Sequence, residues 1–396
     1  MEPDLSRLAD VIDDRGADGY LFDGHDDSDQ YYVCGFDAPD PFVALYDGEG
    51  AHLLVSGLEY GRAVSESRAD SVSRYEEYDY QERAAEDGPR EGRLATIAAF
   101  LADNHVESVL IPGQFPTGTA DGLREHAIDV SVESEDVITE IRSVKTDEEI
   151  EHVRTAQRAN EAAMARAEEL IGGTTVEDGQ LVHDGEVLTS ERVKQAIEIE
   201  LLREGCALDE TIVACGADGA DPHDRGSGPL DAEESIVVDI FPRDKETGYH
   251  ADMTRTFLKG TASEELRDRY EITHEAHGAA LDAVEAGATG ADVHDAVCDV
   301  YEEAGYATLR DDPSTETGFI HGTGHGIGLD VHELPRLNPT GGELKAGQII
   351  TIEPGLYDPD VGGIRIEDLV VVTEDGYENL TDYPKGQNSP EKRSNR

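Results

Sequence analysis

The spacing of apolar residues divides the first 140 residues into helix-like and strand-like segments. Apolar residues recur with helical spacing at 5–18, 92–105 and 120–128, and they form short runs at 19–24, 42–56 and 108–113. The run at 42–56 predicts a hairpin that turns at Asp47 and Gly48. Helices that alternate with strands in this way are typical of a small α/β domain.

The pattern changes near Arg142, where a much longer helical segment follows. Thr146 can cap the start of this helix, and Glu149 stands three residues later, which is the spacing of a capping box. We therefore divide the chain into three parts: an N-terminal domain at 1–141, a second domain at 142–385 and a frayed tail at 386–396.

The second domain mixes helices with strongly apolar strands. Periodicity predicts helices at about 147–171, 190–204, 263–286 and 291–304, and strands at 211–215, 235–241, 249–257, 349–353 and 364–373. Between the first two of these helices, the segment 176–192 is expected to form an added hairpin or loop. The sequence shows no obvious internal repeat.

Acidic residues outnumber basic ones along the whole chain. The 396 residues include 88 Asp and Glu but only 32 Lys and Arg, of which seven are lysines, and the formal net charge is −56. The acidic residues are scattered, which argues against an acidic interaction arm. Their repulsion destabilises a compact state in dilute buffer, and salt at about 1 M screens it within about 3 Å. We therefore expect a protein of a salt-adapted cytoplasm, and no nucleic acid partner.

The cysteines and the apolar runs also favour a cytoplasmic protein. Cys34, Cys206, Cys215 and Cys298 show no paired spacing and are expected to be reduced thiols. The first residues, MEPDLSRLADVIDD, have neither the basic nor the apolar region of an export signal. No apolar run approaches 18 residues, so no membrane partner is expected.

The segment HGTGHGIGLDVHE, residues 321–333, combines three histidines with four alternating glycines. Each glycine costs a helix about 1 kcal/mol relative to alanine, so His321 and His325 are not expected to share a helical turn. The spacing also fails to fit a phosphate-binding glycine loop. Alternating glycines suit an extended segment that a backbone or ligand can approach closely. The pattern favours a histidine loop beside a metal or a substrate.

Carboxylates interrupt several of the apolar strands. Asp239 and Asp252 stand on the two arms of a predicted hairpin, Glu353 ends a strand, and Arg365 and Glu367 fall on one face of the run 364–373. A single such carboxylate is usually hydrogen-bonded or partly exposed. Four of them with a histidine loop point instead to metal, because carboxylates buried among Ile and Val are costly unless they are compensated. Four carboxylates and an imidazole suit two divalent cations that activate a hydroxide and polarise a carbonyl.

The ordered set Asp239, Asp252, His325, Glu353 and Glu367 resembles the signature of the creatinase, prolidase and methionine aminopeptidase superfamily. The resemblance covers the whole chain. It implies an α+β fold in which a pita-bread catalytic domain follows a smaller α/β N-terminal domain, as in Xaa-Pro dipeptidases and aminopeptidases P. Methionine aminopeptidases generally lack such an N-terminal domain and are a poorer match.

The resemblance also assigns roles to individual residues. It implies two divalent metal ions per subunit, held by the five residues of the signature, with Asp252 bridging the ions and Glu367 bridging them or completing one site. Mn²⁺ or Co²⁺ suits so many oxygen ligands, and Zn²⁺ or Fe²⁺ stays open. Glu353 would also accept the proton of the attacking water and pass it to the leaving amine.

Further residues match substrate-contacting positions of that superfamily. His321 and His332 would contact the substrate, and His223 would line the pocket. Arg336 would hold the free carboxylate of a dipeptide, and Arg365 would orient a metal ligand. Simpler interpretations stay open for three of them: a plain ion pair for Arg365, a solvated loop charge for Arg336 and a loop hydrogen bond for His321. Other histidines, such as His274 and His277, are expected to be structural or exposed.

These residues together predict a metal-dependent peptidase that cleaves Xaa-Pro peptides, prefers dipeptides and forms a homodimer. The alternative is an aminopeptidase P that acts on longer peptides. A metal-free creatinase-type hydrolase or a peptide-binding module is less favoured, because such proteins usually lose ligands and all five are present. The sequence departs from the common pattern in two places: Asp239 and Asp252 lie thirteen residues apart, two more than is usual, and the segment 176–192 is an addition.

Overall fold

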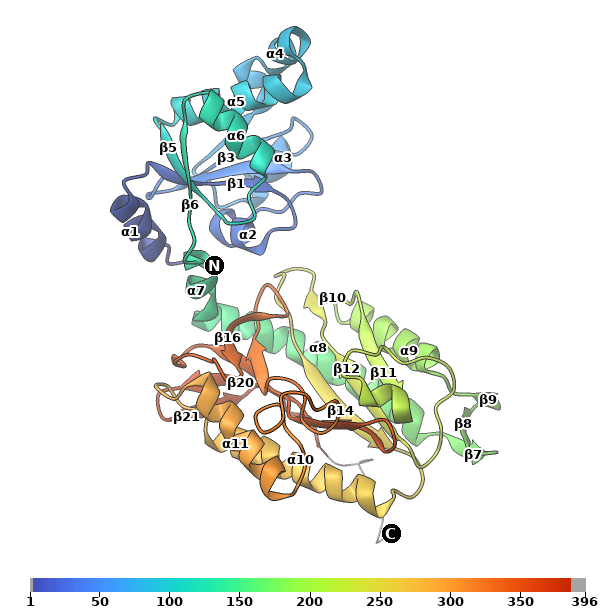
Figure 1. Cartoon of the computed structure of the whole chain (residues 1–396). Coiled ribbons are helices and arrows are strands. Elements are labelled where there is room, and N and C mark those ends of the chain that lie inside the picture. Colours follow the sequence, from blue (N-terminus) through green and yellow to red (C-terminus); the bar gives the residue numbers. More distant parts are fainter. Residues whose placement is uncertain (1–2, 386–396) are drawn as a thin grey trace. The chain divides into compact units, whose positions relative to one another are not determined.

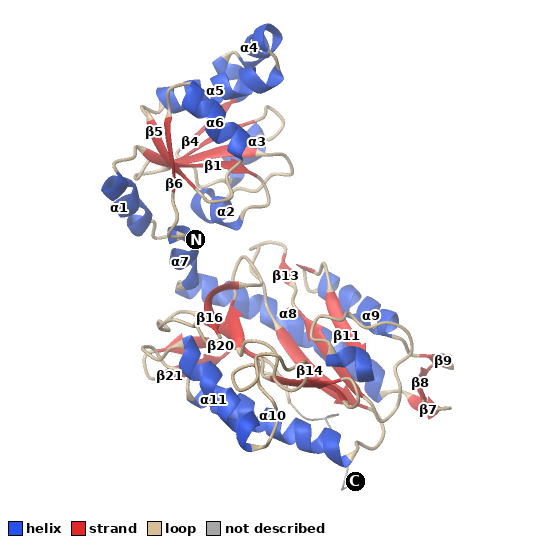
Figure 2. Cartoon of the chain, viewed as in Figure 1, coloured by secondary structure: helices blue, strands red, loops and turns tan. Residues whose placement is uncertain are grey.

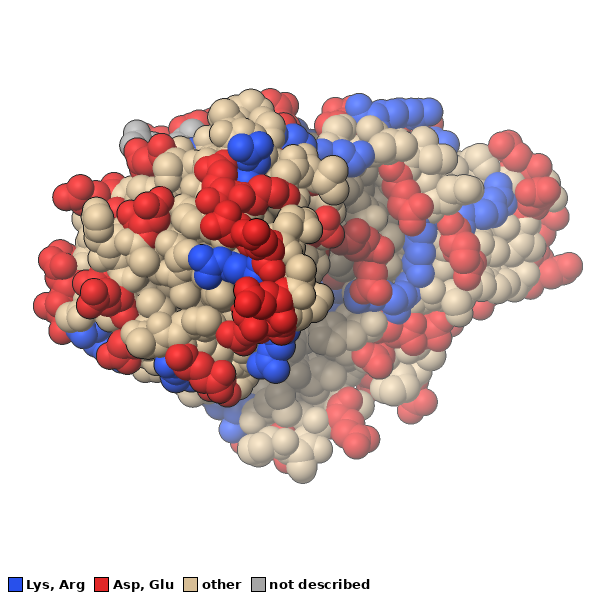
Figure 3. All heavy atoms as spheres, turned by 90° about the horizontal axis from the view of Figure 1, so that it is seen from above, with Lys and Arg blue, Asp and Glu red and all other residues tan. Residues whose placement is uncertain are grey.

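The computed structural model describes residues 3–385 and divides the chain into two compact units, Met1–Arg142 and Ser143–Arg396 (Figure 1). The predicted tail at 386–396 lies outside the described residues. Within those residues, no helix has both the length and the apolar character needed to cross a membrane. The four cysteines are free thiols. On the face drawn in Figure 3, Asp and Glu side chains are scattered over the surface rather than confined to one patch.

The N-terminal unit is a mixed six-stranded sheet with helices, as the alternating pattern predicts (Figure 2). Its strand order is β4-β3-β2-β1-β5-β6, with β1–β2 and β2–β3 antiparallel and the other pairs parallel. The strands are β1 (Gly19–Gly24), β2 (Phe42–Tyr46), β3 (Ala51–Val55), β4 (Ser71–Arg74), β5 (Ser108–Ile111) and β6 (Asp129–Val132). The helices are α1 (Ser6–Arg15), α2 (Ser28–Cys34), α3 (Tyr60–Glu66), α4 (Tyr80–Asp87), α5 (Pro89–Asp103), α6 (Thr117–Glu125) and α7 (Val137–Ser143), with a 3-10 turn at Tyr75–Tyr78.

The long helix α8 (Asp147–Gly172) starts at the predicted capping box. The Glu149 N–H donates to Thr146 Oγ1 at 3.3 Å, and the Thr146 N–H donates to Glu149 Oε2 at 2.8 Å. The second carboxylate oxygen of Glu149, Oε1, accepts a hydrogen bond from the buried Tyr249 hydroxyl at 2.7 Å. The reciprocal bonds satisfy two of the backbone donors that a helix start leaves without partners, so the predicted start of this helix is confirmed.

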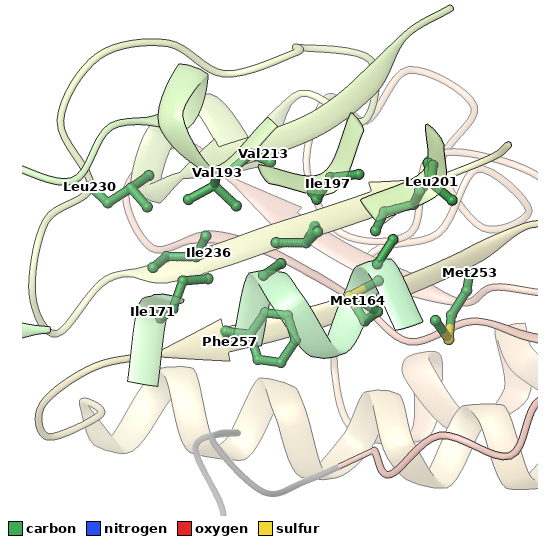
Figure 4. Packing of buried hydrophobic residues seen from close by; sticks show 14 of the residues in the cluster. Met164, Ile171, Val193, Ile197, Leu201, Val213, Leu230, Ile236, Met253 and Phe257 are labelled. Atoms are coloured by element: carbon green, nitrogen blue, oxygen red, sulfur yellow. The ribbon is translucent and has the colours of Figure 1, made fainter. Parts of the chain in front are cut away.

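The first half of the second unit packs two helices on a three-stranded antiparallel sheet. Helices α8 and α9 (Ser190–Arg203) cover β11 (Thr211–Cys215), β12 (Ser235–Ile240) and β14 (Met253–Leu258), in the order β11-β12-β14. Figure 4 shows Met164 and Ile171 of α8 against Ile236 and Phe257 of the strands. Burial of this apolar layer stabilises the sheet that carries the first two predicted ligands.

The second half repeats this two-layer plan with a larger sheet. Helices α10 (Glu264–Asp282) and α11 (Gly290–Glu303) share an apolar core with a five-stranded sheet of order β16-β15-β17-β20-β21. Its strands are β15 (Gly324–Gly326), β16 (Glu333–Leu337), β17 (Ile349–Ile352), β20 (Asp368–Thr373) and β21 (Gly376–Asn379), and a separate ribbon joins β18 (Gly355–Asp358) to β19 (Gly362–Arg365). The predicted α+β architecture, with a pita-bread domain after a smaller α/β domain, is confirmed.

The segment 176–192 mostly forms a three-stranded antiparallel sheet rather than a single hairpin. It consists of β7 (Thr175–Glu177), β8 (Gln180–His183) and β9 (Glu186–Val187). The Leu181 N–H donates to the Leu230 carbonyl at 2.9 Å, which ties this sheet to the loop before β12. Two further short strands, β10 (Cys206–Ala207) and β13 (Arg243–Asp244), pair with each other.

The prediction of one continuous strand at 364–373 is wrong. The segment breaks into β19, which pairs with β18, and β20, which pairs with β17. A strand that changes partners must leave one ladder before it enters the next, and Ile366 and Glu367 occupy that break. Arg365 and Glu367 therefore do not share the face of one continuous strand. Similarly, the strand predicted at 249–257 begins only at Met253, so Asp252 directly precedes the observed strand β14 rather than lying within it.

Candidate metal centre

A cavity of about 820 Å³ opens in the second unit and gathers all ten residues singled out from the sequence. They are Asp239, Asp252, His325, Glu353 and Glu367, the predicted metal ligands, together with His223, His321, His332, Arg336 and Arg365. No residue of the β7–β9 sheet lines this cavity. His274 and His277 also lie outside it: His274 is exposed on α10 and His277 is buried beside Asp368.

The five predicted ligands come from both halves of the unit. Asp239 lies within β12, and Asp252 directly precedes β14, whose Thr254 is the ladder partner of Asp239. His325 is the central residue of β15, Glu353 directly follows β17, and Glu367 lies in the break between β19 and β20. Four of the five therefore stand at or beyond strand ends or on a very short strand, where side chains can turn toward one point.

Ligand atoms of Asp252, His325 and Glu367 all lie within 4.8 Å of one another. His325 Nε2 is also 3.4 Å from Glu353 Oε1 and 3.8 Å from Asp252 Oδ2. The His325 Nδ1–H donates to the Gly326 carbonyl at 3.0 Å, so Nε2 is the nitrogen left for a metal. This cluster is mostly buried and brings together carboxylate and imidazole atoms at distances a metal ion could bridge.

The alternating glycines of the histidine loop serve close backbone packing. A Cβ on Gly324 would lie 2.0 Å from the Thr351 carbonyl oxygen, and one on Gly326 would lie 1.9 Å from that of Leu334. The loop can therefore pass tightly between β16 and β17 only without side chains at these positions. The His325 N–H donates to Thr351 Oγ1 at 3.0 Å, which fixes the loop against β17. The prediction of an extended segment that a backbone approaches closely is confirmed.

Two carboxylate oxygens in this cluster are buried without a hydrogen-bond partner among the described residues. They are Asp239 Oδ1 and Glu367 Oε1. An uncompensated buried carboxylate oxygen is costly, and a divalent cation is the partner that oxygen atoms in such a site accommodate. The donor set of four carboxylates and one neutral imidazole also fits such an ion. The residues present therefore fit the metal that their pattern predicts.

The electrostatics of the cluster agree with this fit. Burial, together with repulsion between the carboxylates, raises the pKa of Asp252 and of Glu367 well above the ordinary range. Burial raises the pKa of Glu353 to about 7. Burial also lowers the pKa of His325 to about 3, so its ring is neutral and can act as a ligand. A positive charge at the centre would relieve the repulsion.

Arg365 is buried and bonds to Asp239 rather than to Glu367. Its Nη2 donates to Asp239 Oδ2 at 2.7 Å, and its Nε donates to Thr254 Oγ1 at 3.1 Å. The Thr254 hydroxyl in turn donates to Glu367 Oε2 at 2.8 Å. Arg365 therefore contacts one predicted ligand directly and the other through a hydroxyl.

Tyr357 is a site residue that the sequence did not reveal. Its buried hydroxyl accepts from Arg365 Nη1 at 3.0 Å and donates to His321 Nε2 at 2.8 Å, while the His321 Nδ1–H donates to the Gly322 carbonyl at 2.6 Å. Burial lowers the pKa of His321 to about 3, which keeps this ring neutral. His321 thus makes the loop hydrogen bond that had been left open, and its contact with substrate stays a prediction. The one signal in the sequence that could have indicated Tyr357 is its position, four residues after the predicted ligand Glu353.

His332 and Arg336 lie on the side of the cavity formed by the histidine loop and β16. The His332 ring meets the His325 ring edge-on with centroids 4.4 Å apart, and burial and the Arg336 charge lower the pKa of His332. Arg336 is the ladder partner of His325 and is exposed. Among residues 3–385, no acidic side chain forms an ion pair with Arg336, so its charge is free to face a ligand.

Comparison with known proteins agrees with this geometry. Residues 151–374 match the model of metallopeptidase family M24, and residues 5–144 match the creatinase/prolidase N-terminal domain. A Xaa-Pro dipeptidase of Pyrococcus furiosus is 30% identical over 356 residues, which cover 89% of this chain and 90% of that protein. The solved structure of prolidase from Pyrococcus furiosus matches with a TM-score of 0.77 and 28% identity, covering 95% of this chain and 100% of that one. The His354Ala variant of Escherichia coli aminopeptidase P matches with a TM-score of 0.73 over 96% of this chain and 95% of that one, and at 21% identity this likeness concerns the fold alone.

Proposed function

Because the chain belongs to metallopeptidase family M24, we propose that it hydrolyses the bond between an N-terminal residue and proline, with Xaa-Pro dipeptides as its preferred substrates. One observation carries the proposal: the five predicted ligands line a single cavity, with two buried carboxylate oxygens left without hydrogen-bond partners among the described residues. A peptide-binding module or a metal-free hydrolase would not need such a set of uncompensated ligands.

The five residues would hold two divalent ions, Mn²⁺ or Co²⁺ by their oxygen-rich character, with Zn²⁺ or Fe²⁺ as further options. When bound, such ions polarise a scissile carbonyl and lower the pKa of a water molecule. Asp252 is deeply buried and lies within reach of His325 and Glu367, so these three residues would hold metal together. Arg365 and Thr254 hold Asp239 and Glu367 in fixed orientations through hydrogen bonds.

Glu353 is placed to carry the proton between water and the leaving amine. Its side chain is 18% exposed, its Oε1 lies 3.4 Å from His325 Nε2, and burial raises its pKa to about 7. A carboxyl group with a pKa near neutral can both accept and return a proton. His332 lies beside His325 at the cavity wall and would donate a hydrogen bond to the reacting carbonyl oxygen. His321 and His223 would complete the wall around the substrate.

Arg336 would select dipeptides. It lines the cavity and lies close enough to His332 for its charge to lower the pKa of that ring. There it would meet a carboxylate that follows proline directly. A longer peptide has an amide at that point and gains nothing from the cation. The alternative, an aminopeptidase P that acts on longer peptides, would show no such gain, and the fold is compatible with either.

The test is metal add-back with a matched pair of peptides. Chelator-treated protein is loaded with Mn²⁺ or Co²⁺, metal content is measured by elemental analysis, and cleavage of Ala-Pro and Ala-Pro-Ala is followed. The proposal expects two ions per chain, restored activity and faster cleavage of Ala-Pro. Preference for the tripeptide would favour aminopeptidase P, and no cleavage of either peptide by metal-loaded protein would contradict both.

A further inference from the structure

One wall of the cavity carries a cation that the proposed chemistry does not use. Arg225 lines the cavity together with Ile212 of β11 and with Phe241, which directly follows β12. Ile212 is the ladder partner of Asp239, so this wall adjoins the metal cluster (strands labelled in Figure 1). Arg336, in contrast, belongs to β16 and adjoins His325 and His332.

The backbone around Arg225 is held tightly against β11. The Val213 N–H donates to the Arg225 carbonyl at 3.1 Å. Gly226 has φ +71°, and a Cβ there would lie 1.9 Å from the Val213 carbonyl oxygen, so the segment comes this close only because residue 226 is glycine. Lys194 Nζ donates to the Gly226 carbonyl at 2.9 Å. These contacts fix where the Arg225 side chain leaves the backbone.

The guanidinium of Arg225 is held by two contacts, but some of its N–H donors have no acceptor among the described residues. It lies 5.8 Å from the centroid of the Phe241 ring, within the range of a cation–π contact. Its Nη2 pairs with Glu210, and both side chains stay well exposed, at 42% and 60%. Among residues 3–385, no acceptor is bonded to Nε or Nη1. Arg225 can therefore donate hydrogen bonds from Nε and Nη1 to a second carboxylate, one that enters from the cavity.

We propose that Arg225 recognises an acidic side chain on the residue before proline, so that Glu-Pro and Asp-Pro are favoured substrates. The inference rests on the proposed function, in which Arg336 takes the carboxylate that follows proline. The first residue of the dipeptide then faces the wall of Ile212 and Phe241. The apolar pair contacts the methylene groups of a glutamate side chain, and Arg225 pairs with its carboxylate.

The decisive comparison is Glu-Pro against Gln-Pro, which have the same shape and differ by one charge. For wild-type protein we expect kcat/KM to be about fivefold higher for Glu-Pro, the scale of a partly exposed, charge-assisted pair. Arg225→Gln should bring this ratio close to one and change kcat/KM for Gln-Pro by less than about twofold. Glu210→Gln, which removes the competing carboxylate, should raise the ratio above that of the wild type.

Three results would overturn the inference while the proposed function stands. A wild-type ratio of one, with Gln-Pro cleaved normally, removes the acid preference and leaves the proposed function intact. Equal losses on both peptides in Arg225→Gln indicate a structural role for Arg225. The third result combines two measurements on Arg225→Gln: an unchanged ratio of kcat/KM between Glu-Pro and Gln-Pro, and a kcat/KM that falls for Ala-Pro but not for Ala-Pro amide. It would mean that Arg225 binds the C-terminal carboxylate instead. If metal-loaded wild type cleaves none of these peptides, the proposed function fails and the inference fails with it.

Discussion

Asp23 of the N-terminal unit and two carboxylates of the predicted metal cluster, Asp239 and Glu367, differ in how their buried oxygens are compensated. In the N-terminal unit, Asp23 accepts from Arg93 Nη1 at 3.0 Å and from the Thr119 hydroxyl at 2.7 Å, and Arg93 Nη2 gives a further bond. Each oxygen of Asp23 thus has a partner. In the second unit, Asp239 and Glu367 each keep one buried oxygen without a hydrogen-bond partner among the described residues.

The presence or absence of hydrogen-bond partners distinguishes buried carboxylates that stabilise the fold from buried carboxylates that are suited to bind a ligand. A buried carboxylate with a cation and a hydroxyl beside it is compensated within the protein. A cluster that repels itself and leaves oxygens unpaired costs stability, and such sites are characteristic of function. The predictions below test this contrast.

The largest effect is expected from removing a predicted ligand or the proton carrier. Asp239→Asn, His325→Ala and Glu353→Gln should each lower kcat by about a thousandfold or more while the protein stays folded, because metal and nucleophile act as one unit. Steady-state kinetics on Ala-Pro and circular dichroism measure the two properties. Glu374→Gln, an exposed carboxylate, is the control and should leave kcat unchanged. A near-normal kcat in the metal-loaded Asp239→Asn variant would contradict the two-metal hypothesis.

A second prediction compares two arginines, Arg93, which is paired with Asp23, and Arg336, which has no acidic partner among the described residues. Arg336→Ala should remove about 2–3 kcal/mol of transition-state binding for Ala-Pro, or about 30- to 150-fold in kcat/KM, and change Ala-Pro-Ala little. Equal losses on the two peptides would mean that Arg336 has a structural role.

The paired arginine should affect stability instead. Arg93→Met leaves the Asp23 carboxylate buried without its cation, and we expect the free energy of unfolding to fall by about 1–3 kcal/mol, discounted because Arg93 is 29% exposed. Urea denaturation measures the change. The kcat of the folded variant should equal that of the wild type, and a selective loss of kcat would contradict the distinction between Asp23 and the predicted metal cluster.

Metal removal should make stability depend on pH in a specific direction. Burial raises the pKa of Glu353 from 4.5 to about 7, so the folded apo protein binds more protons than the unfolded chain between these values. Stability therefore falls as pH rises from about 4.5 to about 7, and the protonated state below this window is the more stable one. Thermal melts across this range measure the slope. Glu353→Gln should reduce the slope without removing it, because the pKa values of Asp252 and Glu367 are raised as well. A rise in apo stability with pH over the same window would contradict the assignment.

The smallest and most diffuse effect is expected from salt. The formal charge is −56, and the acidic side chains on the face drawn in Figure 3 are scattered, so molar KCl should raise the melting temperature and activity by screening repulsion. Melting and turnover are compared between 0.1 and 3 M KCl. Flat curves would refute the salt-adapted interpretation.

Much of the fold could be predicted because its signals are local. The capping box of Thr146 and Glu149, the strand at 211–215 and the hairpin of β2 and β3 lie where periodicity and turn residues indicate. The strand at 364–373 could not be predicted as two, because its apolar pattern continues through a change of ladder partner that depends on β17 and β18.

The sequence by itself determined the order of the predicted metal ligands from Asp239 to Glu367 and the extended histidine loop, because residue type and spacing indicate both. Only the tertiary structure decided that Arg365 bonds to Asp239, 126 residues away, and that Tyr357 joins Arg365 to His321. It alone also placed Arg225 beside Phe241 at the cavity wall. Periodicity describes which way a side chain points within one element, whereas contacts between distant elements depend on how their sheets pack.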